Sequence, residues 1–287
     1  MPPRPGESPP MSALLPLGLA FLMFVVGLRL TTDELAAVFA RPKALLVGLT
    51  AQIVALPAIA LALACAFALP PAQAAGLLVV AAAPGGITSN YAALLARADA
   101  ALSTAMTLVT SLVAFLSVPA ALALGGVGAA GASGAAMLKI SLAMFAVSAA
   151  PLAAGLATRR LAPGFVDRRG AAFDRVARLV FAAIVLATFW ENRAALLDHA
   201  REAGLAVVAL NLAAIGAGWL AARAAGLAPA RRLAIMIETG LQNVALAIFV
   251  ATTALGRGDL TIPALLYAIV MNVTALALIA AGRRGAG

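Results

Sequence analysis

The chain has little charge and almost no cysteine or histidine. Charged residues make up 11% of its 287 residues and hydrophobic residues 64%, whereas soluble domains have about 25% charged and about 45–50% apolar residues. A lone Cys65 excludes an intramolecular disulfide and a cysteine-rich metal site. The composition therefore indicates an all-α integral membrane protein rather than a soluble one.

An integral membrane enzyme, such as a prenyl or phosphate transferase, is the weakest alternative. Such enzymes need clusters of acidic residues or histidines at the membrane boundary to hold a metal or to transfer protons. The segments between the apolar runs contain Asp33, Glu34, Asp167 and Asp174, without a histidine beside them and without a paired spacing. These residues disfavour an enzyme.

The apolar runs are long enough to cross a bilayer, which takes about 20 predominantly apolar residues for a helix. Nine such runs predict a single membrane domain over residues 12–282, between terminal tails at 1–11 and 283–287. The nine runs cover residues 10–28, 44–69, 72–96, 100–124, 135–158, 172–190, 203–222, 232–255 and 262–281.

The formal net charge of +9 suggests an acidic partner, but the positions of the charges argue against nucleic acid. With nine spans, alternate connections face the same side of the membrane, and 15 of the 20 Lys and Arg then lie on one side. Positively charged connections stay in the cytoplasm. We therefore expect an outside N-terminus, a cytoplasmic C-terminus, membrane lipid as the surroundings and no nucleic-acid partner.

Two of the predicted spans contain an interruption. In the third span, Pro84 is followed by two glycines, and this combination removes a helical donor and lowers the cost of leaving helical geometry. The helix is predicted to stop near Ala83 and to start again near Thr88. In the eighth span, Gly240 loosens the segment 238–243. One interrupted span in each half of the chain is typical of an inverted-repeat secondary transporter with its site at mid-membrane depth.

Glu238 is the only ionisable residue in the run 233–256. A carboxylate at this depth costs roughly 2.5–3.5 kcal/mol, and a bound cation is the simplest way to offset that cost. Ser103, Thr107 and Ser111 lie four residues apart and so share one helical face. Their hydroxyls could add oxygen ligands for a hard cation, although Ser111 is expected only to bond a carbonyl of its own helix.

Two further amides, Gln52 and Asn272, are predicted to lie deep in their spans. Each could take part in the site or could simply bridge two helices. The residues alone also leave open whether Glu238 holds a metal cation or carries a proton.

Three blocks of the sequence resemble one family, the bile acid:sodium symporters and their bacterial homologues. The first is Ala-Gln-Ile-Val-Ala-Leu-Pro at 51–57. The second is Pro-Gly-Gly-x-x-Ser-Asn at 84–90, followed by Ser103 and Thr107. The third is Glu-x-Gly-x-Gln-Asn at 238–243. The resemblance extends over almost the whole chain after the N-terminal tail.

The resemblance implies a panel domain and a core domain, with two broken helices that cross in the core. Helices at about 12–30, 135–158 and 172–190 would form the panel, and those at about 42–124 and 203–282 the core. The first helix of the ten-helix bacterial form would be absent, which leaves nine. A monomer would be sufficient, in the inner membrane of a bacterium.

The resemblance also implies two sodium sites that share one carboxylate. The first would use the side chains of Ser89, Asn90, Ser103, Thr107 and Glu238. The second would use Glu238, the side chains of Gln52 and Gln242, and the carbonyl oxygens of Thr239 and Leu241. The organic anion would contact Thr88, Asn243 and Asn272. Ile87 and Met271 depart from more polar positions of the family, so the substrate's identity does not follow.

The function expected from the residues and the resemblance together is sodium-coupled symport of an organic anion by alternating access. Two sodium ions would bind with the anion, either a bile-acid-like compound or a small carboxylate such as pantothenate. Proton-coupled transport through Glu238 is the alternative.

Overall fold

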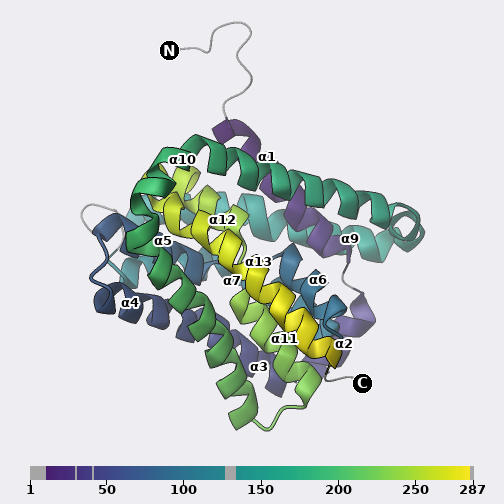
Figure 1. Ribbon diagram of the computed structural model, residues 1–287. Coiled ribbons are helices and arrows are strands. Elements are labelled where there is room, and N and C mark those ends of the chain that lie inside the picture. The colour runs from purple at the N-terminus through teal and green to yellow at the C-terminus, as the bar shows by residue number, and fades with distance from the viewer. Residues whose placement is uncertain (1–10, 30, 41, 127–133, 285–287) are drawn as a thin grey trace, which may run out of the picture.

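The computed structural model describes residues 11–29, 31–40, 42–126 and 134–284 (Figure 1). The predicted tails at 1–11 and 283–287 lie outside these residues, except for Met11, which begins the first helix, and Arg283 and Arg284, which end the last. Within the described residues every regular element is a helix, and no strand longer than an isolated bridge occurs. The predicted all-α class is therefore confirmed.

One group of helices lies in the part of Figure 1 that holds the labels α1, α9 and α10. Its elements are α1 (Met11–Leu28), α8 (Gly134–Met144), the π-helical turn η2 (Phe145–Ala149), α9 (Ala150–Leu161) and the beginning of α10 (Pro163–Ala224). Helix α1 packs against α9 because Gly27 and Gly155 face each other. A methyl group on either glycine would overlap the main chain of the other helix, as expected where small residues let membrane helices approach closely.

The other elements surround the two predicted interruptions. They are α2 (Thr32–Ala40), α3 (Lys43–Thr50), the π-helical turn η1 (Ala51–Ala55), α4 (Leu56–Ala66), α5 (Pro71–Ala82), α6 (Ile87–Leu95), α7 (Ala100–Leu124), α11 (Pro229–Gly240), α12 (Val244–Phe249), the π-helical turn η3 (Val250–Ala254), the 3-10 turn η4 (Gly258–Leu260) and α13 (Thr261–Arg284). Most of their buried side chains belong to one continuous apolar core that also includes α1 and α9.

The connection between the predicted spans 172–190 and 203–222 is helical, and the expectation of a loop there was wrong. The chain is helical throughout Pro163–Ala224, 62 residues in all. The connecting segment 191–202 contains no Gly or Pro and is rich in Ala, Leu, Glu and Arg, which favour helix. A straight helix of that length would measure about 93 Å, but in Figure 1 the ribbon runs across the molecule and then turns down.

Five of the described helical segments are long and apolar enough to cross a membrane. They are Lys43–Ala66, Ala100–Leu124, Leu138–Leu161, Ala203–Ala224 and Gly258–Arg284. Shorter apolar helices cover Leu15–Leu28, Pro71–Ala82 and Val244–Ala254. These lengths fit a protein that crosses the membrane several times, while the predicted count of nine spans stays a prediction.

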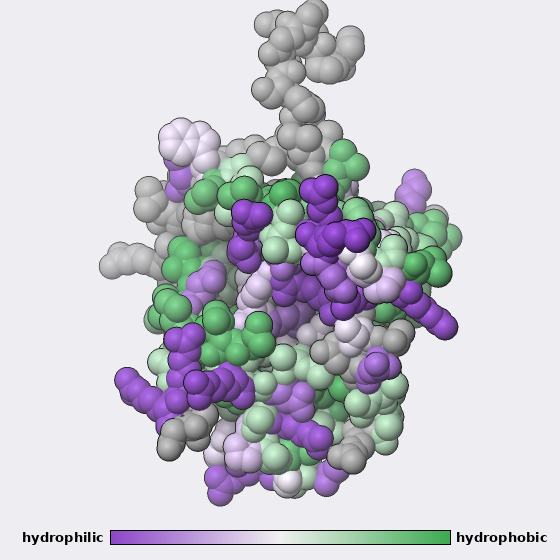
Figure 2. Space-filling view, turned by 90° about the vertical axis from the view of Figure 1, so that its right-hand side faces the viewer, coloured by the Kyte–Doolittle hydropathy of each residue, from purple (hydrophilic) through white to green (hydrophobic). Residues whose placement is uncertain are grey.

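The surface is not uniformly apolar. Figure 2 looks at the side of the molecule where α2 and α9 lie, and hydrophilic residues gather in the middle of that face with apolar residues around them. Large hydrophobic side chains are also exposed, among them Leu124, Leu161, Leu179 and Leu276. Exposed leucines in such number fit a surface that faces lipid rather than water.

Candidate functional site

The two interruptions occur where the sequence predicts them. Helix α5 ends at Ala82, Ala83 is extended, and α6 begins at Ile87. Helix α11 ends at Gly240, Leu241 is extended, and α12 begins at Val244. Both interruptions are confirmed, and each leaves main-chain amide and carbonyl groups without their helical partners.

The two interruptions contact each other through their main chains. Gly85 and Gln242 form an isolated antiparallel bridge, and the N–H of Asn243 donates to the carbonyl oxygen of Pro84 at 2.9 Å. Non-helical backbone at membrane depth is tolerated only when it is buried in protein or lines a cavity. Here each broken helix satisfies part of the backbone of the other, so the segments cross as one unit.

Beside this crossing, Glu238 is fully buried on the last turn of α11. Its Oε2 lies 2.6 Å from the Ser103 hydroxyl, and its Oε1 is hydrogen-bonded to the Thr107 hydroxyl. The same two hydroxyls lie 3.1 and 3.2 Å from Oδ1 of Asn90. Among the described residues, no Arg or Lys forms an ion pair with Glu238. Its charge therefore faces neutral oxygens only.

These oxygen atoms make more contacts than they have protons. Ser103 and Thr107 each touch both Glu238 and Asn90, but a hydroxyl has only one proton to donate. With Glu238 ionised and the amide oxygen of Asn90 turned toward the two hydroxyls, two of these four oxygen–oxygen contacts lack a hydrogen. An oxygen cluster of this kind, with one carboxylate among neutral oxygens, has the chemistry of a site for a hard cation.

The cluster packs directly against Gly85. A methyl group added to Gly85 would overlap Oε1 of Glu238 and lie 3.1 Å from the Thr107 hydroxyl. Gly85 is thus required for the close approach of the backbone to the carboxylate. Ser89 lies next to the same carboxylate, and its hydroxyl also donates to the carbonyl oxygen of Gly86 at 2.7 Å.

A second group of polar side chains lies at the same crossing. Nε2 of Gln52 donates to Oε1 of Gln242 at 2.7 Å and to the carbonyl oxygen of Ala83 at 3.3 Å. Gln242 in turn donates to the carbonyl oxygen of Thr239 at 2.7 Å. Oε1 of Gln52 is buried without a hydrogen-bond partner among the described residues. An unpaired buried amide oxygen is costly and is available to a cation.

Gln52 lies in a π-helical turn that a proline explains. The N–H of Leu56 donates to the carbonyl oxygen of Ala51, five residues earlier. Pro57 has no N–H for the carbonyl of Ile53, and its ring would clash with that carbonyl in a regular α-helix. The same pattern recurs where Pro151 follows η2. Such turns are frequent at functional sites.

The predicted sodium ligands are thus brought together around the crossing, whereas the predicted substrate contacts are divided. Thr88 and Asn272 line one cavity. Asn243 lies beside a narrow gap, where its Oδ1 caps α12 by accepting from Leu246 N at 3.0 Å. Asn272 is exposed, and its Nδ2 donates to the carbonyl oxygen of Ala268 one turn back. Asn272 lies in the middle of α13, and its depth in the membrane stays a prediction.

Two polar residues at the crossing were not predicted from the sequence. Asn211 of α10 and Tyr267 of α13 both donate to the carbonyl oxygen of Gly240, at 2.8 and 2.9 Å. Both residues are fully buried. Asn211 is the single amide in the apolar run 203–222, a signal that the sequence does contain. The Ser111 hydroxyl was also misjudged, since it is buried without any partner among the described residues.

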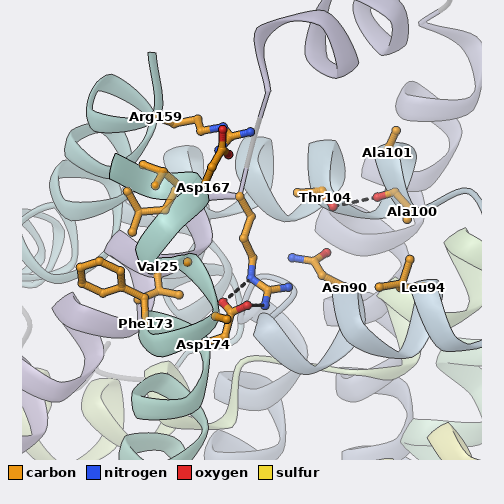
Figure 3. A pocket seen from close by; sticks show the side chains of 15 residues that line it. Val25, Asn90, Leu94, Ala100, Ala101, Thr104, Arg159, Asp167, Phe173 and Asp174 are labelled. Atoms are coloured by element: carbon orange, nitrogen blue, oxygen red, sulfur yellow. Dashed lines mark hydrogen bonds and ion pairs between the residues drawn. The ribbon is translucent and has the colours of Figure 1, made fainter. Parts of the chain in front are cut away.

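Two cavities border this region, and both are lined in part by α6 and α10. The first, about 430 Å³, lies between α1, α9 and α10 on one side and α6 and α7 on the other. In Figure 3 the amide of Asn90 points into it, opposite Phe173 and Asp174. The second, about 550 Å³, lies between α6, α10 and α13 and is mostly apolar. Residues 90 and 91, adjacent on α6, each line a different cavity.

A helical membrane bundle in which two broken helices cross beside a buried carboxylate defines a secondary transporter. The model of the sodium bile acid symporter family matches residues 16–199, more than half of the chain. The chain belongs to that family.

Curated relatives agree with this assignment. The chain is 27% identical over 270 residues to the probable sodium/metabolite cotransporter BASS1 of Arabidopsis thaliana chloroplasts, covering 94% of this chain and 67% of that protein. It is 29% identical over 243 residues to the sodium-dependent transporter YocS of Bacillus subtilis, covering 84% and 74%. A shorter match of 31% over 109 residues, 38% of this chain and 31% of the relative, is to the ileal sodium/bile acid cotransporter of Oryctolagus cuniculus. The chain thus belongs to a family of sodium-dependent transporters rather than to a family of enzymes.

Proposed function

We propose that the protein is a sodium-coupled symporter of an organic anion that works by alternating access. The observation that carries the proposal is the oxygen cluster around Glu238, which has fewer protons than oxygen–oxygen contacts and no ion-pair partner among the described residues. A monovalent cation with oxygen ligands would fill that shortage and neutralise the carboxylate.

Two sodium ions would share Glu238. The first would be held by the side chains of Ser89, Asn90, Ser103, Thr107 and Glu238. The second would be held by Glu238, by the side chains of Gln52 and Gln242, and by the carbonyl oxygens of Thr239 and Leu241. Two features of Gln52 support the second site: its Oε1 has no hydrogen-bond partner among the described residues, and its Nε2 donates to Gln242.

The crossing would couple the ions to the anion. Ions bound at these two sites would hold the segments 83–86 and 241–243 in the crossed arrangement, and Thr88 lies in the first turn of α6, directly after the first segment. An anion that contacts Thr88 or Asn243 would therefore meet a backbone that the ions have ordered, and Asn272 of α13 would add a further contact. Each ligand then raises the affinity for the other by the same factor.

Transport would require the panel and the core of a nine-span bundle to move relative to each other. The panel would comprise α1, α8, α9 and the first part of α10, and the core the remaining helices. The substrate would be an anion with an apolar body, either bile-acid-like or a small carboxylate such as pantothenate. The protein would lie in a bacterial inner membrane, with its N-terminus outside and its C-terminus in the cytoplasm.

Uptake into proteoliposomes tests the proposal against proton coupling, which a buried carboxylate among hydroxyls would also suit. Labelled cholate or pantothenate is supplied outside, with either sodium or potassium at the same pH and ionic strength. Accumulation is expected only with an inward sodium gradient. Equal accumulation in potassium, or accumulation driven by a pH gradient alone, would exclude sodium coupling.

A further inference from the structure

Tyr91 of α6 lies between two arginines of other helices. The side chains of Arg29 and Arg178 both donate to its hydroxyl, Arg178 at 3.1 Å. The guanidinium carbons lie 4.0 Å from the Tyr91 ring centroid for Arg29 and 5.4 Å for Arg178. Accepting from two guanidinium groups uses both lone pairs of the phenol oxygen. The hydroxyl is neutral, so it does not balance the positive charge of either arginine.

The two arginines differ in how their charge is balanced. Arg29 pairs with Asp174 through two contacts, Nε to Oδ1 at 2.9 Å and a second nitrogen to Oδ2 at 2.5 Å. Arg178 forms no ion pair with any carboxylate of the described residues, and its side chain is exposed. Arg178 therefore keeps a guanidinium group that an external anion can reach.

The two cavities show the same difference in charge. Four charged residues border the 430 Å³ cavity, and they form two ion pairs, Arg29 with Asp174 and Arg159 with Asp167, each at 2.5 Å. This cavity is electrically balanced. The 550 Å³ cavity has Arg178 as the only charged side chain among the described residues that line it. An anion is thus favoured in the second cavity and not in the first.

The second cavity also has the size and lining of a ligand site. Its volume lies within the range of about 300–1,000 Å³ that is usual for pockets that hold small molecules. Phe181, Leu241, Leu276 and Ile279 supply apolar contacts. Thr88 and Asn272 add a hydroxyl and an amide. One cation beside a mostly apolar wall complements a molecule with one anionic group and an apolar body.

We propose that Arg178 binds the anionic group of the substrate, and that the apolar body of the substrate lies in the cavity between α6, α10 and α13. This inference rests on the function proposed above and names the residue that selects for negative charge. A guanidinium binds a carboxylate or sulfonate through two parallel hydrogen bonds. Tyr91, held from the other side by Arg29, keeps the Arg178 guanidinium at the cavity.

The arrangement also separates the two charges that move together. Asn90 lines the balanced cavity and contacts the oxygen cluster of Glu238, while Tyr91 lines the cavity that contains Arg178. Cation and anion would therefore approach different faces of the same turn of α6. Order in that turn is shared by both sites, so the binding of sodium and of the anion is linked.

Binding measurements in phosphatidylcholine nanodiscs with saturating sodium test the assignment. The probes are cholate, its uncharged carboxamide, and pantothenate. In Arg178→Gln the affinity for the anionic probe that wild type binds should fall at least tenfold. In Arg178→Lys it should fall less. The carboxamide should bind wild type and Arg178→Gln equally. Arg175→Gln is the matched control, because Arg175 is exposed one turn earlier and donates to the carbonyl of its own helix at Ala171.

Equal affinity of wild type and Arg178→Gln for the anions would overturn the inference, as would a wild type that binds neither cholate nor pantothenate. Stabilisation by phosphatidylglycerol that Arg178→Gln abolishes, with cholate binding unchanged, would assign the residue to lipid and would also overturn it. Stabilisation by sodium alone should be the same in Arg178→Gln and wild type. If sodium stabilised neither wild type nor Arg178→Gln, while the tenfold difference in anion affinity remained, sodium coupling would be rejected and the anion site would be kept.

Discussion

The main-chain N–H of Asn243 donates a 2.9 Å hydrogen bond to the carbonyl oxygen of Pro84. This bond joins two segments that are far apart in the sequence and that have both left helical geometry. Because Asn243 also caps α12 through its side chain, its position sets where the second helix starts again. Anything that moves one interruption therefore moves the other, and the carboxylate of Glu238 lies directly beside both.

Gly85→Ala should abolish the response to sodium while the protein still folds. The added methyl group would overlap Oε1 of Glu238 and would push the carboxylate away from Ser103 and Thr107. Thermal unfolding in detergent with increasing sodium chloride, at constant ionic strength set by potassium chloride, measures the effect. Gly204→Ala is the control, since a methyl group there meets nothing within 4 Å. Sodium stabilisation of Gly85→Ala equal to that of the control would contradict the placement of the ion.

Glu238→Gln keeps the shape of the side chain and removes its charge. Sodium affinity should fall at least tenfold, a loss of about 1.4 kcal/mol or more, because the remaining ligands are all neutral. Calorimetric titration of sodium chloride into the purified protein measures it. Asp259→Asn, which removes an exposed carboxylate paired with Arg257, should leave the titration unchanged. A saturable sodium titration of unaltered affinity in Glu238→Gln would show that the ion lies elsewhere.

The interruptions could be predicted from the sequence because their causes are local. Pro84 and the glycines after it act on their own turn, and Gly240 does so in α11. Helix α5 ends one residue before Ala83, and α11 ends at Gly240, within the segment 238–243 expected to be loosened. Glu238 could also be identified from the sequence, since a single carboxylate in an apolar run needs a partner. The expectation that the two broken helices cross rested on the family resemblance. The main-chain bridge between them joins residues distant in sequence and was not predicted.

Other features could not be predicted from local signals. Asn211 and Tyr267 are single polar residues in apolar helices, and only the folded chain brings both to the carbonyl of Gly240. The polar segment 191–202 resembles a loop by charge, yet its helix-forming residues keep it helical. The charge balance of Arg178 depends on which carboxylates lie near it in space, and a count along the sequence does not contain that information.

Tyr267→Phe and Asn211→Leu should each destabilise the fold modestly. Each removes one donor to the carbonyl oxygen of Gly240 and leaves the other. Hydrogen bonds between membrane helices average about 0.6 kcal/mol, so each single change should cost about that much. The double variant should cost more than the sum, since it leaves a buried carbonyl unpaired.

Reversible unfolding in mixed micelles measures these losses. Thr274→Val provides a comparison, because the Thr274 hydroxyl bonds carbonyls of its own helix at Val270 and Met271. Strict additivity in the double variant would show that the two donors act independently and that Gly240 is not the shared point.

Pro57→Ala should weaken sodium binding without touching a proposed ligand. An N–H at position 57 could donate to the carbonyl of Ile53, so the π-helical turn could relax to a regular α-helix. A regular α-helical turn spans one residue fewer than a π-helical turn. The change would therefore rotate Gln52 by about 100° about the helix axis, away from Gln242. We expect the sodium affinity to fall severalfold in the calorimetric titration. Pro151→Ala, which acts on the corresponding turn η2 outside the crossing, should have no such effect. Equal sodium affinities in the two variants would mean that the turn does not orient Gln52 for the ion.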